Sequence, residues 1–345
     1  MDETDSLTDE QLAGQRLVVG FKGKVLDDDL RFVIREMHVG GLILFKRNVS
    51  DASRVSELCQ AAQACAKESG QPPLMIAIDQ EGGPVARLGP PFTVFQGNRA
   101  IGAARSEKAA REFGTITARE LKGAGITMNL APVLDVAPQG LNSVMADRVF
   151  GEEPELVAYL GKAVIETLQK TGIAATAKHF PGIGRTTADS HVDLPYLDAD
   201  RQLLDSTDLV PFRAAIESGV EAVMLSHVVY RDLDSAWPAS LSTVIARDLL
   251  RKDMGFKGIT MTDDLDMGAI DKHFDVETTV RRISDAEIDI ALICHDRLKM
   301  EKAYRALLKA VRESEDARRK ATASVRRILN MKRRYPLSPA ETNRP

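Results

Sequence analysis

The segment from Lys178 to Pro195, KHFPGIGRTTADSHVDLP, contains a carboxylate and an imidazole that could act together. Asp189 and His191 are separated in it by a single serine. A carboxylate at this spacing can accept the ring N–H of the histidine and stabilise its protonated form, and the pair then works as a general acid and base. The same spacing occurs in ordinary polar turns. The segment therefore predicts either proton transfer or a turn.

A second candidate group is the carboxylate of Asp263, in the segment Gly258–Met267, GITMTDDLDM. It follows an apolar run that is typical of a buried strand. Retaining cleavage of a glycosidic bond needs a carboxylate nucleophile and a separate acid/base about 5 Å away. Asp263 and the Asp189–His191 pair could supply these roles. Asp264 is the competing nucleophile, but side chains alternate near a strand end, so Asp264 points elsewhere if Asp263 points into the pocket. Asp264 or Asp266 could instead cap a helix.

A third carboxylate, Asp79, ends the apolar run in IAIDQEGGPVARL and is followed by a Gly-Gly turn. In this position it could hold two hydroxyl groups of a sugar, and Arg87 could return to the same pocket. The glycine pair does not indicate a phosphate-binding loop, because no Lys-Ser or Lys-Thr follows it.

Short apolar runs alternate with longer helical patterns along the whole chain. The eight strand candidates are Leu17–Phe21, Gly41–Phe45, Leu74–Asp79, Thr127–Asp135, Ala174–His179, Ala222–His227, Gly258–Asp263 and Asp289–Cys294. The eight helical candidates are Asp27–His38, Asp51–Ser69, Ser106–Gly123, Glu153–Lys170, Asp200–Ser218, Thr243–Met254, Val276–Asp285 and Arg297–Lys332. This alternation predicts a parallel sheet with helical crossovers. We expect an α/β fold, a closed (β/α)8 TIM-type barrel; an open doubly wound sheet is the alternative.

Several of these strand candidates end in polar side chains. The residues concerned are Asp79, Lys178, His179, His227 and Asp263. In a parallel barrel the carboxyl ends of the strands meet on one face, where barrel enzymes carry out their chemistry. Any one of these groups could be structural, but their recurrence on four strands predicts an active site on that face.

Composition limits the classes of function. The chain has 345 residues and a net charge of −4, which argues against a general nucleic-acid or anionic-membrane surface. The start, MDETDSLTDEQ, lacks the basic and apolar parts of a secretory signal, and no apolar run approaches the ~20 residues of a membrane span. Three cysteines without such a signal favour reduced thiols in the cytoplasm. We expect one domain over residues 1–345 with a core of about 15–335, and neither metal nor cofactor.

The motifs resemble glycoside hydrolase family 3, and within it the single-domain β-N-acetylglucosaminidases. The family pattern KHFPGHGxTxxDSHxxLP matches Lys178–Pro195 except at one position, and the resemblance covers roughly residues 15 to 335. Further matching stretches are GLILFKRNV, DQEGG, NLAPVLDV, AVMLSHV, PASLS and TDDLDMGAI.

The resemblance implies a role for each matching residue. Asp263 corresponds to the nucleophile, and His191 to the acid/base of a dyad with Asp189. The residues that match those gripping the sugar at the non-reducing end are Asp79, Arg87, Arg148, Lys178 and His179. The implied activity is that of a retaining exo-β-N-acetylhexosaminidase acting on small carbohydrates, such as N-acetylglucosaminides from peptidoglycan recycling. The larger β-glucosidases of the family differ, since they take an acid/base Glu from a second domain.

Two positions depart from the family pattern. Ile183 stands where a histidine is usual, and Pro84 where an arginine is usual. Neither change removes the nucleophile or the dyad. They leave three alternatives open: a β-glucosidase or broad β-glycosidase, a glycoside phosphorylase, and a sugar-binding barrel that has lost turnover. We also expect the dyad loop to be attached to the barrel mainly at Lys178–His179, and therefore to be mobile.

Overall fold

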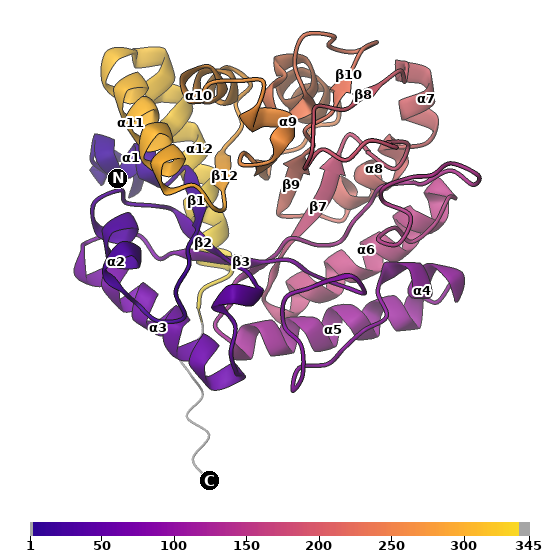
Figure 1. Cartoon of the computed structure of the whole chain (residues 1–345), viewed down its shortest axis with the longest axis horizontal. Helices are drawn as coiled ribbons and strands as arrows, with labels where there is room; N and C mark the ends of the chain where they lie inside the picture. Colours follow the sequence, from indigo (N-terminus) through magenta and orange to yellow (C-terminus); the bar gives the residue numbers. More distant parts are fainter. Residues whose placement is uncertain (1–2, 338–345) are drawn as a thin grey trace.

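The computed structural model describes residues 3–337, and within this range eight parallel strands close into a barrel (Figure 1). The strands, in barrel order, are β1 (Leu17–Gly20), β2 (Gly41–Leu44), β3 (Met75–Ile78), β6 (Met128–Asn129), β7 (Ala174–Phe180), β9 (Ala222–Leu225), β11 (Ile259–Asp264) and β12 (Ile290–Ile293). Pairing of β12 with β1, with Ala291 opposite Leu17, closes the ring. Every predicted strand is present, and the barrel is confirmed over the open sheet.

Helices surround the ring of strands (Figure 1). They are α1 (Asp9–Gly14), α2 (Asp28–Arg35), α3 (Ala52–Glu68), α4 (Asn98–Ala103), α5 (Glu107–Gly123), α6 (Pro154–Thr171), α7 (Arg201–Ser206), α8 (Leu209–Glu217), a π-helix (Thr243–Asp253), α9 (Gly268–Asp271), α10 (Val276–Asp285), α11 (Arg297–Glu313) and α12 (Glu315–Arg334). Short polar side chains start many of them: Asp27, for example, accepts the N–H of Leu30 at 2.8 Å. Such caps satisfy N–H groups that have no partner inside the helix.

Three predicted elements differ in detail. The strand expected over Thr127–Asp135 shortens to Met128–Asn129, since Pro132 has no N–H for a regular ladder. The helix expected over Asp200–Ser218 divides into α7 and α8. The last predicted helix divides at Ser314, whose extended backbone ends α11 and whose side chain caps α12.

The apolar side chains form an inner and an outer layer. Alternate strand residues such as Val18, Ile43 and Met261 fill the inside of the barrel, while their neighbours, such as Val19, pack against the helices. This is the alternation that a strand imposes. Ile328, Met331 and Tyr335, in α12 and just beyond it, join the inner layer. α12 therefore closes the amino-terminal end of the barrel.

Two small sheets lie outside the barrel. β4 (Gln80–Gly82) and β5 (Val85–Ala86) form an antiparallel hairpin directly after β3. β8 (Tyr196–Leu197) pairs with β10 (Val229–Tyr230) and connects the end of the dyad loop to the segment after β9. Both sheets thus support segments that lead away from the carboxyl ends of barrel strands.

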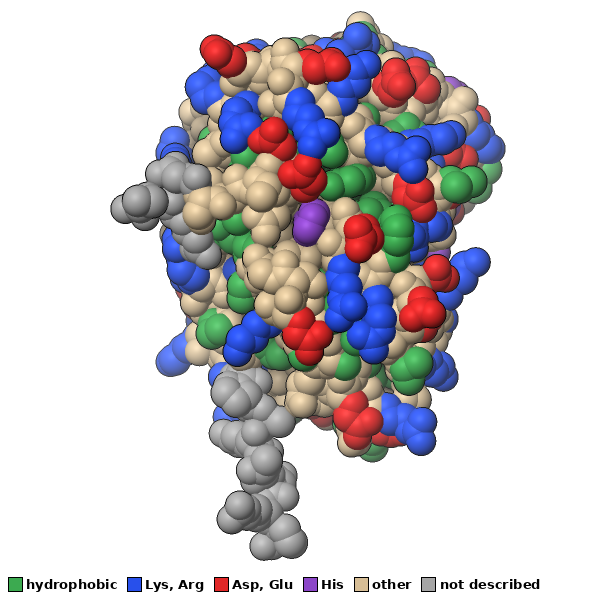
Figure 2. Space-filling model, turned by 90° about the vertical axis from the view of Figure 1, so that its left-hand side faces the viewer, with side chains coloured by type: hydrophobic (Ala, Val, Ile, Leu, Met, Phe, Trp, Pro, Cys, Tyr) green, Lys and Arg blue, Asp and Glu red, His purple; other side chains and the backbone are tan. Residues whose placement is uncertain are grey.

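The surface is charged but mixed in sign. On the face in Figure 2, Lys and Arg side chains are interspersed with Asp and Glu. This pattern agrees with the small net charge of −4. Within the described part of the chain, no helix is both long enough and apolar enough to cross a bilayer.

Candidate active site

Charged groups from three segments meet at the carboxyl ends of the barrel strands. Asp79 follows β3, Lys178 lies in β7, and Glu81 lies in the hairpin strand β4. The Lys178 Nζ is 2.9 Å from Asp79 Oδ1 and 2.6 Å from Glu81 Oε1. The Lys178 and Glu81 side chains are each only 2% exposed, and that of Asp79 is 14% exposed. Buried charges persist in proteins when they are paired in this way.

Two arginines complete this mouth cluster, which we define as Asp79, Glu81, Arg87, Arg148 and Lys178. Arg87 donates to Asp79 Oδ2 at 3.1 Å, as its predicted return to the pocket requires. Arg148 holds Glu81 in a bidentate pair at 2.8 and 3.0 Å. Planar guanidinium groups suit this geometry. The cluster carries three cations and two carboxylates.

The pKa shifts in the mouth cluster follow from these pairs. Burial raises the pKa of Asp79, but Lys178 and Arg87 outweigh burial and bring the pKa to about 2. For Glu81, burial is likewise opposed by Lys178 and Arg148, and its pKa is also lowered. Burial lowers the pKa of Lys178, yet the two carboxylates raise it overall. All three groups are therefore charged at neutral pH.

His179 is oriented by a buried carboxylate. Its Nδ1 lies 2.8 Å from Asp135 Oδ2, and its Nε2 is 3.5 Å from an Arg148 nitrogen. The second oxygen of Asp135 accepts the N–H of Ile183 at 2.8 Å. A neutral ring would then hold its proton on Nδ1 and leave Nε2 directed toward the mouth cluster.

Asp263 lies in β11 beside these groups. Burial raises the pKa of its carboxyl, but the neighbouring His179 and His227 rings outweigh burial, and the net shift is downward. The N–H of Asp264, 2.8 Å from Asp263 Oδ1, and the ammonium of Lys178 act in the same direction. Asp263 is therefore an ionised, half-buried carboxylate at the barrel mouth.

His227 fixes the backbone next to Asp263. Its Nε2 is 2.9 Å from the Asp264 carbonyl oxygen, so this nitrogen must be the donor, while Nδ1 is 2.7 Å from the Ser240 hydroxyl. Burial lowers the pKa of His227 although Asp263 opposes this, and the nearby His191 ring lowers it further. His227 thus positions the strand end.

Asp264 and Asp266 have a different role from Asp263. Asp264 Oδ1 accepts the N–H groups of Asp266 and Cys294, each at 3.0 Å. Burial, and then the charge of Asp266, raise the pKa of Asp264 to about 7. Asp266 Oδ2 accepts the N–H of His295 at 2.7 Å, while α9 begins after Met267 without a side-chain cap. The helix-cap interpretation of these two residues was therefore wrong: they join the loops after β11 and β12.

The Asp189–His191 pair is formed, and it is exposed. Asp189 Oδ1 accepts the N–H of His191 at 2.9 Å and lies 2.8 Å from the ring Nδ1. The two side chains are 53% and 70% exposed, respectively. The contacts build a turn and orient the ring at once, and proton transfer by the pair stays a prediction. Burial raises the pKa of Asp189, but the His191 contacts outweigh it and Arg148 contributes to the lowering.

The dyad loop is held at its tip as well as at its base. The N–H of Gly268 donates to the His191 carbonyl at 3.2 Å, and that of Ala269 to the Ser190 carbonyl at 3.1 Å. Lys272 Nζ donates to the Val192 carbonyl at 2.7 Å. A Cβ on Gly268 would lie only 2.8 Å from the His191 carbonyl oxygen. The expectation of attachment mainly at Lys178–His179 was wrong, because α9, directly after the Asp263 segment, supports the tip.

The two departures from the family pattern lie in different surroundings. Ile183 is 7% exposed and packs into the outer apolar layer at the base of the dyad loop. Pro84 is exposed in the turn between β4 and β5. Ile183 therefore adds apolar packing under the loop and does not alter its exposed tip.

Sequence reasoning missed two carboxylates of the site, Glu81 and Asp135. Both stand close to a predicted strand end, Glu81 in DQEGG and Asp135 in NLAPVLDV, and this was the signal available. Among residues 3–337, no group of three or more His, Cys, Asp or Glu side chains is arranged to hold a metal ion.

A parallel barrel with an ionised carboxylate and a dense set of charged hydrogen-bonding groups at its mouth defines a barrel enzyme of the glycoside-cleaving class. Residues 8–331 match the model of the glycosyl hydrolase family 3 N-terminal domain. The chain belongs to this family, as its motifs predicted.

Known relatives agree with this assignment. The β-hexosaminidase of Thiobacillus denitrificans is 39% identical over 288 residues, which cover 81% of this chain and 78% of that protein. The solved family 3 β-N-acetylglucosaminidase of Paenibacillus sp. superposes with a TM-score of 0.95 at 40% identity over 99% of this chain, which spans 65% of that one. The β-N-acetylhexosaminidase of Beutenbergia cavernae gives a TM-score of 0.88 at 28% identity, covering 94% and 98% of the two chains.

Proposed function

We propose that this glycoside hydrolase is a retaining exo-β-N-acetylhexosaminidase that removes terminal β-linked N-acetylglucosamine. The observation that carries the proposal is the ionised, half-buried carboxylate of Asp263 beside the mouth cluster. The names of its relatives support the choice of sugar. A site that holds a single sugar ring at the mouth of a closed barrel suits removal of one terminal sugar from the non-reducing end.

The mouth cluster and His179 would hold the terminal sugar. Asp79 has two oxygens already oriented by Lys178 and Arg87, so it can accept from sugar hydroxyls without reorganising. Arg148 and the Nε2 atom of His179 offer further polar contacts close by. Groups that are fixed before binding lose little entropy when the substrate arrives.

The reaction would proceed in two steps. Asp263 attacks the anomeric carbon while His191 gives a proton to the departing oxygen, and a glycosyl–aspartate ester forms. Water, deprotonated by His191, then hydrolyses the ester with net retention. Asp189 holds Nδ1 of His191, which leaves Nε2 for both proton transfers. Asp264 is the poorer nucleophile, because a carboxyl with a pKa of about 7 is substantially protonated at neutral pH.

One assay separates this function from its enzymatic rivals. Release of nitrophenol from nitrophenyl N-acetyl-β-glucosaminide should exceed release from the plain β-glucoside by at least about tenfold, which corresponds to 1.4 kcal/mol. Phosphate should leave the rate and the product unchanged. A preference for the glucoside would favour a β-glucosidase, and a sugar 1-phosphate product would identify a phosphorylase.

The sugar-binding alternative makes a different prediction. A barrel that binds without turnover would show saturable binding of N-acetylglucosamine but no nitrophenol release and no covalent ester with a fluorosugar. Ile183 is buried at the base of the dyad loop and replaces neither Asp263 nor the Asp189–His191 pair, which speaks for an active enzyme.

For the natural setting we propose peptidoglycan fragments carrying N-acetylglucosamine as substrates, in the cytoplasm. Cys59, Cys65 and Cys294 are buried free thiols in the structure, as a reducing compartment allows. We further propose a single domain with a core of about residues 15–335, which the span of barrel elements from Leu17 to Arg334 supports.

A further inference from the structure

The turn that carries Asp189 and His191 is held against the barrel by one short segment. Within residues 3–337, the hydrogen bonds that join this dyad turn (residues 189–193) to segments outside its own loop all come from residues 268–273, which we call the α9 segment. The α9 segment begins five residues after Asp263 in the sequence. Its position therefore relates the proposed acid/base to the proposed nucleophile.

Three successive carbonyl groups of the dyad turn accept hydrogen bonds from the α9 segment. The carbonyl oxygens of Ser190 and His191 accept backbone N–H groups at 3.1 and 3.2 Å, respectively. The carbonyl oxygen of Val192 accepts the Lys272 ammonium at 2.7 Å. These bonds fix the backbone at His191 and on both sides of it.

The dyad turn also lies within electrostatic range of the barrel mouth. Burial lowers the pKa of His227, and the His191 ring adds to this lowering. His227 donates to the Asp264 carbonyl oxygen at 2.9 Å, so it stands directly beside the proposed nucleophile. A shift of the dyad turn would therefore be felt at the reacting groups.

Gly268 allows the close approach between the dyad turn and the α9 segment. A Cβ at this position would lie 2.5 Å from the Val192 carbonyl oxygen and 2.8 Å from that of His191. Both oxygens belong to the backbone, so rotation of a side chain cannot relieve the overlap. The φ of Gly268 is not in the left-handed region, so what the position requires is space and not a conformation that favours glycine.

The α9 segment is fixed, whereas the dyad turn is exposed. Ile270 is 2% exposed and packs in the outer apolar layer. Lys299 binds both Asp266 and Asp271, at 3.0 and 2.6 Å. The His191 side chain, in contrast, is 70% exposed. A side chain at position 268 would therefore displace the dyad turn and leave the α9 segment in place.

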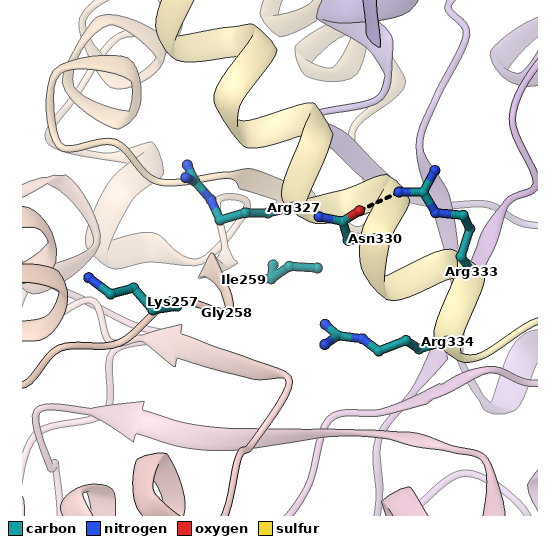
Figure 3. A pocket seen from close by; sticks show the side chains of 7 residues that line it. All are labelled: Lys257, Gly258, Ile259, Arg327, Asn330, Arg333 and Arg334. Atoms are coloured by element: carbon teal, nitrogen blue, oxygen red, sulfur yellow. Dashed lines mark hydrogen bonds between the residues drawn. The ribbon is translucent and has the colours of Figure 1, made fainter. Parts of the chain in front are cut away.

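The strand that carries Asp263 is also held at its start. Figure 3 shows Ile259, where the chain enters β11, across a hollow of about 440 Å³ from the last half of α12. The next residue, Thr260, donates its N–H to Asp289 Oδ2 at 2.9 Å, and Arg251 binds the same oxygen at 2.6 Å. This support keeps the strand in place when the dyad turn moves.

We propose that Gly268 is a positioning residue: its missing side chain lets the α9 segment hold His191 at the distance from Asp263 that protonation of the leaving oxygen needs. The inference rests on the proposed function, which assigns His191 as the acid. An error of about 1 Å in the placement of a reacting group can cost about 10²-fold in rate. A larger residue at position 268 should therefore impair protonation of the leaving group and spare attack by Asp263.

Leaving-group dependence tests the proposal on the full chain. The quantity measured is kcat/KM, which reports the steps up to ester formation, for an alkyl and a nitrophenyl N-acetyl-β-glucosaminide. For Gly268→Ala we expect a loss of at least about tenfold on the alkyl glycoside and of less than about threefold on the nitrophenyl glycoside, which needs little protonation. Labelling of Asp263 by a fluorosugar with a nitrophenyl leaving group should stay within about threefold of the parent rate.

Three further variants complete the test. The matched control Gly123→Ala, in α5, places its Cβ in open space and should match the parent on both substrates. Lys272→Met removes one hydrogen bond of the α9 segment without an overlap, and should lower kcat/KM by about threefold or more on the alkyl glycoside alone. Adding Gly268→Ala to His191→Ala should cost nothing further, because the acid that is positioned has gone.

The outcomes separate this inference from the proposed function. Equal losses on both substrates in Gly268→Ala, or loss of Asp263 labelling, would mean that position 268 only maintains the structure of the site, and would overturn the proposal. A leaving-group contrast for His191→Ala without one for Gly268→Ala would overturn the positioning role alone. No contrast for His191→Ala would overturn the acid role of His191 and this inference with it.

Discussion

The mouth cluster and the Asp189–His191 pair are two parts of one proposed site with opposite physical character. The first has a buried centre: Lys178 and Glu81 are each 2% exposed, and Lys178 forms two ion pairs shorter than 3 Å. The second stands in solvent, with His191 70% exposed, and only one carboxylate holds its ring. One region is built on strands and a hairpin, the other on a loop.

The difference follows from the tasks proposed for the two regions. Groups that grip a neutral sugar perform best when they are already oriented and stay charged, and burial among opposite charges achieves this. A group that must release and regain protons needs access to water and to the leaving group. The support of the loop by α9 connects the regions, since α9 follows the strand that carries Asp263.

Asp263 should show the largest effect, because no other carboxylate of the site can replace it in the first step. We expect Asp263→Asn to lower turnover by several orders of magnitude and to abolish covalent labelling by a fluorosugar, read by mass spectrometry of the labelled peptide. Asp264→Asn, the matched control, should keep the label. A label on Asp264 or Asp266 in the parent protein would show that the nucleophile is misassigned.

The next largest effect tests the exposed region. We expect His191→Ala to reduce kcat/KM by about 10²- to 10⁴-fold for substrates with poor leaving groups, because departure of the oxygen then lacks its proton. Nitrophenyl glycosides, whose leaving group needs little protonation, should lose far less in the first step. Steady-state kinetics on an alkyl and a nitrophenyl N-acetyl-β-glucosaminide measure the contrast. Equal losses on both substrates would mean that the pair is only a turn.

The free energy of unfolding should depend far more on the mouth cluster than on the exposed Asp189–His191 pair. Lys178→Met leaves two buried carboxylates without their shared cation, so the free energy of unfolding should fall by about 3–5 kcal/mol. His191→Ala changes an exposed side chain and should cost less than about 0.5 kcal/mol. Urea denaturation followed by circular dichroism measures both. Similar costs for the two variants would show that water reaches the carboxylates of the mouth cluster.

The smallest effect concerns Asp264. In the folded state it keeps its proton up to about pH 7, whereas in the unfolded chain it loses the proton near its ordinary pKa of 3.8. The unfolded state therefore binds fewer protons between these values, and this residue makes stability decrease as the pH rises. Between about pH 5 and pH 8 the free energy of unfolding should therefore fall by about 1–3 kcal/mol less in Asp264→Asn than in the parent protein. An unchanged pH dependence in denaturant titrations would show that Asp264 is already ionised at pH 5.

Much of the fold was predictable because strands and helices leave local patterns. Each apolar run ending in a polar residue became a barrel strand, and the eightfold alternation left few other closed topologies. The errors fell where one residue changes local geometry. Pro132 shortened β6, and Ser314 divided a long helical pattern whose composition is otherwise uniform.

The site was predictable to the extent that its residues occur in motifs. Asp263, Asp189 and His191 were identified from spacing and resemblance, and their placement in one reaction remains a proposal. Glu81 and Asp135 were missed because their partners, Lys178, Arg148 and His179, come from other strands and loops. A buried carboxylate and a surface carboxylate look alike in a sequence until the partner is known.

The sequence by itself determined the barrel, the family and the residue types available for chemistry, because these depend on periodicity and on short motifs. Only the tertiary structure decided which carboxylates are ionised. Asp263 and Asp264 are neighbours in the chain, yet their pKa values shift in opposite directions. Burial raises both, but histidines outweigh burial at Asp263, whereas the charge of Asp266 adds to burial at Asp264. The tertiary structure also decided that α9 supports the dyad loop and that α12 closes the barrel floor. The physical reason is shared: burial and charge act through space, between segments that the chain order keeps far apart.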